Sequence, residues 1–261
     1  AVGNFSSVNA QYKAAEELQE QYAGVRYQYI DDQGNVIYTG MDTQIKDADI
    51  KTVLKENPQQ KFAKVYSWDT MPLRLGDLGI EELDSTAYSA AVEQYKLTEM
   101  SNFDVLGFKD IKGRFPKDYK EMAISSYLAD IILTQGIADE KGKLQFPKSY
   151  DDILQNVKLP IGDTWMRISG IVSKDTSKYE SLKKVSANNI DSETYKLVRE
   201  FRNIANISSN KLYVKEGFVN TVKQQKGTVL DSSRHNLFLR VNDEDKGMSS
   251  LAYPAQAVSY Y

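Results

Sequence analysis

The residue types that most often carry catalysis are scarce in this chain. It has no Cys and a single His among its 261 residues. Without Cys there is no disulfide, no thiolate nucleophile and no Cys-based zinc site. His235 stands in a polar turn before an expected strand, and no Gly-x-Ser-x-Gly segment presents a serine to it. The sequence therefore does not favour a Ser-His-acid triad, and one His cannot serve as both base and ligand.

Residues 136–144 come nearest to a phosphate-binding loop. Such a loop has the form Gly-x4-Gly-Lys-Ser/Thr, so that backbone N–H groups cradle the phosphates while the hydroxyl meets Mg²⁺. Here five residues separate Gly136 from Gly142, and Leu144 stands where the hydroxyl should be. We interpret the stretch as a helix-ending glycine followed by a charged turn, and we expect no ATP site in this chain.

Other short patterns also lack parts that their chemistry needs. The two Ser-x-x-Lys pairs have no downstream Lys-Thr-Gly element; they are Ser181/Lys184 and Ser208/Lys211. Residues 242–247 begin like a calcium loop, but Lys246 and Tyr253 occupy positions where oxygen ligands are required. The acidic pairs at 31–32 and 151–152 fit a turn and a helix start. We predict no catalytic, cofactor-binding or metal-binding residues and no enzymatic activity.

Composition and charge indicate a folded protein that is not expected to bind a strongly charged partner such as nucleic acid. The chain carries 33 Lys and Arg against 36 Asp and Glu, a net charge of −3. This balance gives no reason to expect nucleic acid or an anionic membrane surface as a partner. The most apolar stretch, 124–137, is interrupted by polar residues and is too short for a membrane helix. The chain begins Ala-Val-Gly-Asn, without Met or a basic segment, which indicates a piece of a larger protein.

Hydrophobic periodicity and turn signals predict helices and strands that are interspersed along the chain. The expected helices are 10–23, 47–56, 86–96, 192–205, one that starts at Ser125 or Ser126 and ends at Gly136, one after Ser149, and a short one at 217–223. The expected strands are 25–29 and 36–38, which form a hairpin, then 61–68, 121–124, 164–172, 212–214 and 237–241. Residues 69–84 and 173–189 are expected to be loops. Because adjacent strands resemble hairpins rather than crossovers, we predict an α+β fold.

One stretch of the sequence resembles a known family. Residues 106–116 read LGFKDIKGRFP, and residues 120–129 read KEMAISSYLA. They resemble the extracytoplasmic domain of MacB/FtsX-type ABC transporter permeases, where a Gly-Arg-aromatic-Pro turn precedes a strand that runs into a helix. Later segments follow the family order, namely 150–153, 168–172, 211–214 and 237–241. The chain departs from the family at 154–157, where many relatives carry Ile-Gly-Lys-Thr.

The resemblance implies a porter-like α/β-sandwich subdomain with an inserted, smaller sabre-like α+β subdomain. It implies that 1–115 is the first part of the porter-like subdomain, that 116–208 is the insertion, and that 209–261 returns to the porter-like part. Such a domain stands on the extracellular face of the membrane, between the first and second membrane helices. It relays ATP-driven motion for export of, or resistance to, peptides, drugs or lipoproteins, without a cofactor. The Lys-, Asn- and Tyr-rich composition without Cys favours the surface of a Gram-positive cell.

The resemblance also implies partners. They are a second permease subunit, a cytoplasmic ATP-binding subunit reached through the membrane part, a peptide or lipoprotein substrate and an accessory adaptor protein, with no nucleic acid. Two other functions stay open from the residues alone. The 17 Tyr could serve a free or lipid-anchored protein that binds peptides or carbohydrates, and carboxylates or His235 could serve a hydrolase. We expect the isolated domain to be monomeric or weakly dimeric.

Overall fold

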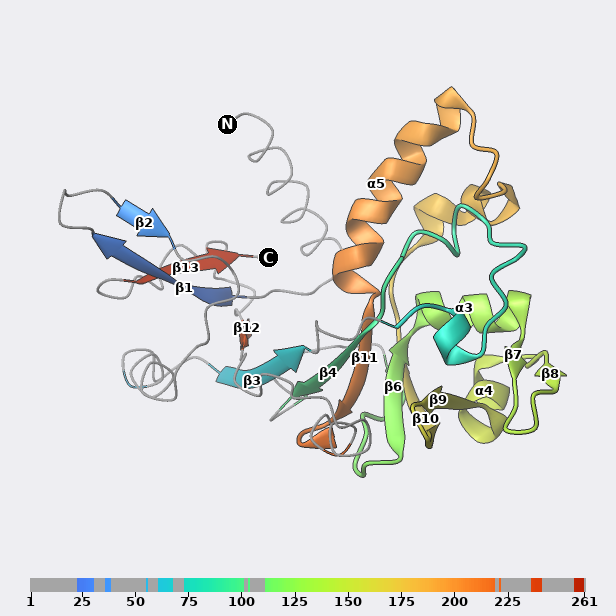
Figure 1. Ribbon diagram of the computed structural model, residues 1–261, viewed down its shortest axis with the longest axis horizontal. Helices are drawn as coiled ribbons and strands as arrows, with labels where there is room; N and C mark the ends of the chain where they lie inside the picture. Colours follow the sequence, from blue (N-terminus) through green and yellow to red (C-terminus); the bar gives the residue numbers. More distant parts are fainter. Residues whose placement is uncertain are drawn as a thin grey trace.

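The computed structural model describes the chain in several ranges, which are 23–30, 36–38, 55, 61–67, 73–100, 103, 111–218, 221, 236–240 and 256–260. A mixed sheet of eight strands forms its centre (Figure 1). The strands are β3 (Lys61–Ser67), β4 (Lys96–Met100), β5 (Ile111–Gly113), β6 (Glu121–Ser125), β9 (Lys158–Ile161), β10 (Thr164–Val172), β11 (Lys211–Lys215) and β12 (Asn236–Arg240).

The strand order of this sheet is β12-β3-β4-β11-β6-β10-β5. Two pairs are parallel, β4 with β11 and β6 with β10, and the other pairs are antiparallel. The long strand β10 pairs with β5 near its end and with β9 near its start. The sheet thus contains both parallel and antiparallel strand pairs, and helices lie between some of its strands in the sequence. This confirms the predicted α+β class.

A second sheet joins the two ends of the described chain. It has the order β13-β1-β2 and consists of β1 (Ala23–Ile30), β2 (Val36–Tyr38) and β13 (Gln256–Tyr260). The predicted hairpin is confirmed, since β1 and β2 pair antiparallel. Strand β13 was not predicted. It runs antiparallel to β1 with Ala23 opposite Tyr260 (Figure 1).

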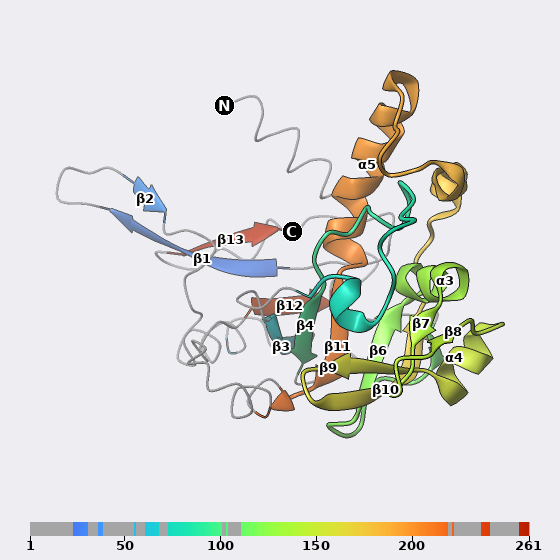
Figure 2. The same cartoon turned by 45° about the vertical axis from the view of Figure 1, so that its right-hand side comes forward.

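The helices lie toward one end of the large sheet, as Figures 1 and 2 show. They are α3 (Ser126–Gln135), α4 (Tyr150–Asn156) and α5 (Ser192–Ser208), with 3₁₀ turns η1 (Gly76–Leu78) and η3 (Ser177–Lys184) and a small hairpin of β7 (Ile137–Ala138) and β8 (Leu144–Gln145). Both views show α5 extending beyond the sheet and leading directly into β11.

Two helix starts follow the expected capping chemistry. The Ser125 and Ser149 hydroxyls accept bonds from the N–H groups of Leu128 and Asp152 at 3.2 and 3.1 Å. A Ser oxygen at this place satisfies one of the donors that the first helical turn leaves without an intrahelical partner. At the other end of α3, Gly136 has a φ of 73°, as expected for a helix-ending glycine.

The predicted helix at 86–96 is wrong. The segment forms turns, and Lys96 already begins β4. The N–H groups of Ala87 and Tyr88 donate to the carbonyl oxygens of Val185 and Leu182 at 2.7 and 3.2 Å, and not to carbonyls four residues earlier. The apolar side chains of the segment are buried as expected. The spacing of these apolar residues therefore predicted correctly that their side chains are buried, but it did not predict the backbone conformation.

Two further expectations need correction. The polar stretch 173–189 contains the 3₁₀ turn η3, whose Tyr179 and Leu182 are buried. Helix α5 is confirmed. The apolar spacing in 192–205 predicted Tyr195 on the same buried face as Val198, Phe201 and Ala205, but Tyr195 is exposed while the other three are buried. The predicted helices 10–23, 47–56 and 217–223 lie wholly or mostly outside the described residues.

Stacked aromatic rings form the core between α5, η3 and α3. The ring centroids of Phe201 and Tyr179 are 4.5 Å apart, and those of Phe201 and Tyr88 are 5.1 Å apart. Tyr127 of α3 closes the cluster with its centroid 5.8 Å from that of Phe201. Its hydroxyl donates to the carbonyl oxygens of Tyr88 and Ser89 at 2.7 and 3.0 Å. This hydroxyl thus fixes the irregular backbone of the 86–95 segment.

The variant Tyr127→Phe is expected to lower the free energy of unfolding by about 1–2 kcal/mol, since it leaves two buried carbonyl oxygens without this donor. Urea denaturation measures the change. Tyr195→Phe is the matched control, because Tyr195 is 53% exposed and its hydroxyl can be replaced by water at little cost. Equal effects of the two substitutions would contradict this role of Tyr127.

Candidate functional site

The described part of the segment that carries the family resemblance, residues 111–129, forms a short strand, a turn, a second strand and the start of a helix. β5 ends at Gly113, which has a φ of 80°, a region that L-residues other than glycine rarely adopt. The N–H of Arg114 then donates to the carbonyl oxygen of Ser169 at 2.9 Å. The chain turns at buried Pro116 and continues into β6 and α3. The predicted strand at 121–124 and the helix after it are thereby confirmed.

A buried carboxylate holds this turn against the sheet. The side chain of Glu121 is 2% exposed and lies at the first position of β6. Its two oxygens accept bonds from Nη1 and Nη2 of Arg114 at 3.0 and 2.5 Å, and Oε2 also accepts from Nη2 of Arg167 at 2.6 Å. The N–H of Lys117 donates to Oε1 at 3.2 Å. We call these four residues the Glu121 clamp.

The clamp keeps Glu121 ionised. Burial alone would raise the pKa of this carboxyl, but the bonds from Arg114, Arg167 and the Lys117 N–H outweigh burial and lower the pKa from 4.5 to about 2. A carboxylate so fully engaged by donors is a poor general base. Its geometry instead joins the 114–117 turn to β6 and β10, so the Glu121 clamp is a structural joint.

A second polar cluster connects the helices. The carboxylate of Asp130 on α3 accepts a bond from the Tyr150 hydroxyl on α4 at 2.5 Å, and its other oxygen lies 3.5 Å from Nζ of Lys183 on η3. The same Nζ lies 4.8 Å from the ring centroid of Tyr88. Burial and the bond to Asp130 raise the pKa of Tyr150. The cluster thus ties α3, α4, η3 and the 86–95 segment into one body.

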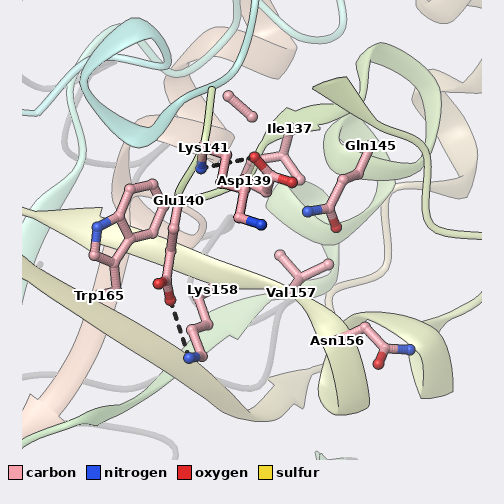
Figure 3. Close-up of a pocket in the computed structure, with 10 residues that line it drawn as sticks. Ile137, Asp139, Glu140, Lys141, Gln145, Asn156, Val157, Lys158 and Trp165 are labelled. Carbon is pink, nitrogen blue, oxygen red and sulfur yellow. Dashed lines mark hydrogen bonds and ion pairs between the residues drawn. The ribbon is translucent and has the colours of Figure 1, made fainter. Parts of the chain in front are cut away.

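A pocket with a cavity volume of about 300 Å³ opens beside these helices. Figure 3 shows Trp165 of β10 at one side of the pocket, and Gln145 of β8 and Asn156 of α4 at the other. The buried side chains of Ile137 and Val157 supply its apolar part. Pockets of this size and mixed lining can hold a small ligand.

The two carboxylates of the pocket, those of Asp139 and Glu140, are held in place by hydrogen bonds and an ion pair. Oδ1 of Asp139 accepts bonds from the N–H groups of Lys141 and Lys143 at 2.9 and 2.8 Å. These backbone bonds lower the pKa of Asp139. Nζ of Lys158 lies 3.0 Å from Oε1 of Glu140, an ion pair drawn as a dashed line in Figure 3. Backbone donors therefore fix one carboxylate, and an ion pair at the surface holds the other.

Residues 136–144, the stretch nearest to a phosphate-binding loop, have a different local structure from such a loop. The predicted helix-ending glycine and charged turn are confirmed, and the turn lies within the β7–β8 hairpin, which was not predicted. The two N–H groups that could face a phosphate donate to Asp139 instead. A fixed carboxylate at the centre of the turn repels an anion.

Among the described residues, the structure does not bring the other candidate residues from the sequence analysis together in one site. Ser181 and Lys184 are exposed on η3, and the pair 151–152 lies in the first turn of α4, where the sequence placed it. Asp151 forms a surface ion pair with Lys112 at 3.2 Å. His235, the pair 31–32, residues 242–247 and the Ser208 side chain lie outside the described residues.

Sequence reasoning missed the pocket. Its residues come from β7, the β7–β8 turn, β8, the end of α4, β9 and β10. Residues 137–141 lie within the stretch that was compared with a phosphate-binding loop, but nothing in that stretch indicated the other half of the lining. In the predicted strand 164–172, the alternation of side chains places Trp165 on the face opposite to Met166, and this was the only indication of its role. Within the described ranges, no three His, Asp or Glu side chains gather as metal ligands, and none of the helices there is long and apolar enough to cross a bilayer.

Comparison with known proteins adds no assignment. No protein-family model matches the chain, and no curated protein matches it significantly.

Proposed function

We propose that this chain is the non-catalytic extracellular domain of an ABC transporter permease of the MacB/FtsX type. It relays ATP-driven motion of the membrane dimer for export of, or resistance to, peptides, drugs or lipoproteins. The observation that carries the proposal is the pairing of β1 with β13, which sets Ala23 opposite Tyr260. The described chain thus enters and leaves at one place, as a domain held between two successive membrane helices must.

The rest of the fold supports a relay because it is stiffly connected. β4, β11, β6 and β10 lie side by side in one sheet, and the Glu121 clamp joins the 114–117 turn to that sheet. Motion that reaches the large sheet would therefore be passed on to α3 and α4, which pack on β6 and β10. We place the porter-like part at 1–115 and 209–261 and the sabre-like insertion at 116–208, with strands of both contributing to the shared sheet.

The partners follow from this placement. A second permease subunit and a cytoplasmic ATP-binding subunit would supply the motion through the membrane part, at the extracellular face of a Gram-positive cell membrane. A peptide or lipoprotein substrate and an accessory adaptor would receive it. No cofactor and no nucleic acid enter this proposal.

The gene sequence that flanks these 261 codons tests the proposal first. We expect an apolar segment of about 20 residues shortly before residue 1 and another after residue 261. Polar sequence on both sides would contradict the proposal and favour a free or lipid-anchored binding protein.

Removal of the domain from the complete transporter tests the relay itself. Since Ala23 and Tyr260 are opposite each other on paired strands, a short Gly-Ser linker can replace residues 23–260 without pulling the membrane helices apart. The expected result is an assembled complex that still hydrolyses ATP but has lost export or resistance. Export at the original rate would show that the domain relays nothing. A transporter with the linker inserted at Gly142, an exposed turn, is the control and should stay active.

A further inference from the structure

We propose that the pocket beside Trp165 binds a neutral saccharide of about one or two sugar rings. The inference rests on the residues that line the pocket and does not depend on the proposed transport function.

The charges that line the pocket cancel. Asp139 and Glu140 carry two carboxylates, and Lys141 and Lys158 carry two ammonium groups. A balanced set gives no net potential to attract phosphate, a carboxylate or an organic cation. A charged ligand would also have to displace one member of the Lys158–Glu140 pair and leave the other without its partner. The electrostatics of the pocket therefore favour a neutral ligand.

The polar side chains that line the pocket are suited to bind the hydroxyl groups of a saccharide. Each hydroxyl both donates and accepts, so neighbouring hydroxyls on a ring need donors and acceptors side by side. The Lys158–Glu140 pair offers this combination at 3.0 Å, with both side chains about half exposed at 53% and 52%. Nδ2 of Asn156 donates to Oδ1 of Asp152 at 2.6 Å, which fixes the plane of the amide and the direction of its oxygen.

Trp165 supplies the apolar wall that a sugar ring needs. Its indole is only partly buried although the side chain is large and apolar, whereas the next residue, Met166, is fully buried. Figure 3 shows the indole at one side of the pocket, with Gln145 and Asn156 at the other. The C–H groups on one face of a pyranose can pack on such a ring while its hydroxyls reach the opposite side.

The edge beside the pocket disfavours an extended peptide. Trp165 is opposite Pro160 on β9, the short strand that flanks the start of β10. A peptide added along β9 would meet a residue without a backbone N–H, so the ladder of hydrogen bonds would be interrupted there. A ring-shaped ligand that uses side chains alone does not require that ladder.

The variant Trp68→Phe provides the background for the test, because Trp165 is then the only tryptophan. The probes are glucose, N-acetylglucosamine, maltotriose and chitotriose. We expect at least one of them to change the Trp165 fluorescence saturably, with a Kd of about 0.1–10 mM. Calorimetry with Trp165→Ala should show at least tenfold weaker binding, and Trp165→Phe should retain most of the affinity. Tyr195→Ala, which removes an exposed aromatic ring on α5, should bind as the parent does.

Three results would overturn the proposal. The first is the absence of saturable binding for all four sugars. The second is binding that survives Trp165→Ala, with circular dichroism showing that the variant is folded. The third is binding restricted to the charged or peptide probes, which are inorganic phosphate, Nα-acetyl-lysine amide and trialanine. None of these results bears on the flanking-gene test, so the two proposals fail separately.

Discussion

Glu121→Gln is expected to lower the free energy of unfolding at pH 7 by about 2–3 kcal/mol. The substitution keeps the shape of the side chain but removes the charge that Arg114 and Arg167 share. Their guanidinium groups then face a neutral amide whose nitrogen is a donor like themselves. The loss stays below that of a fully buried ion pair because the two arginine side chains are 41% and 54% exposed, so water can solvate part of each charge.

The same carboxylate gives the wild-type protein a pH dependence at the acid end. The folded-state pKa of Glu121 is about 2, below the ordinary value of 4.5. A group whose pKa is lowered by folding stabilises the protein above its unfolded pKa, and that contribution is lost as the pH falls. Stability from this residue should therefore be complete above about pH 4.5 and disappear between about pH 4.5 and 2. The difference between wild type and Glu121→Gln should shrink over this range.

Urea denaturation at a series of pH values between 7 and 2 measures both effects. Asp151→Asn is the matched control, because Asp151 forms its ion pair with Lys112 at the surface and its side chain is 67% exposed. We expect the control to change stability by less than about 0.5 kcal/mol. If wild type and Glu121→Gln lose stability in parallel down to pH 2, the Glu121 clamp does not stabilise the fold in the way described.

The predictable parts of the fold are those whose signals are local. Ser125 caps α3 and Gly136 ends it, and both residues act within one helical turn of their own position. β10 was predicted with its observed bounds because alternation of side chains needs no partner to be visible. The class of the fold followed from the order of such elements, and not from any one of them.

The parts that could not be predicted depend on contacts that are distant in sequence. The 86–95 segment has the spacing of a helix, but Leu182 of η3 and Val185, which follows η3, supply carbonyl oxygens to Tyr88 and Ala87 from more than ninety residues away. Tertiary hydrogen bonds of this kind override a local preference worth a few tenths of a kcal/mol per residue. The pocket is still harder to predict from the sequence, because its lining forms only when the β7–β8 hairpin, the end of α4, β9 and β10 come together.

Gly113→Ala is expected to destabilise the protein by about 3 kcal/mol, for two separate reasons. A φ of 80° costs an alanine about 1–2 kcal/mol. A Cβ at this position would also overlap the carbonyl oxygen of Ser169 on β10, so β5 would have to move away from β10 at a cost of about 1–3 kcal/mol.

Gly142→Ala separates the two reasons. Gly142 has a similar φ of 77°, but a Cβ there would meet no atom within 4 Å. We expect this variant to lose only about 1 kcal/mol, the conformational part alone. Urea denaturation of both variants gives the difference, which measures the close approach of β5 to β10. Equal losses would show that the approach is not tight.

Gly113 and the Glu121 clamp should prove to be coupled. Arg114 follows Gly113 directly, and its N–H bonds Ser169 while its guanidinium bonds Glu121. A shift of β5 caused by Gly113→Ala would carry Arg114 away from Glu121, so part of the clamp would be lost already. The double variant with Glu121→Gln should therefore lose less than the sum of the single variants, by about 1 kcal/mol. Strict additivity would mean that the turn and the clamp stabilise the fold independently, whereas coupling would make the 113–121 segment one stiff unit, as a domain that transmits motion requires.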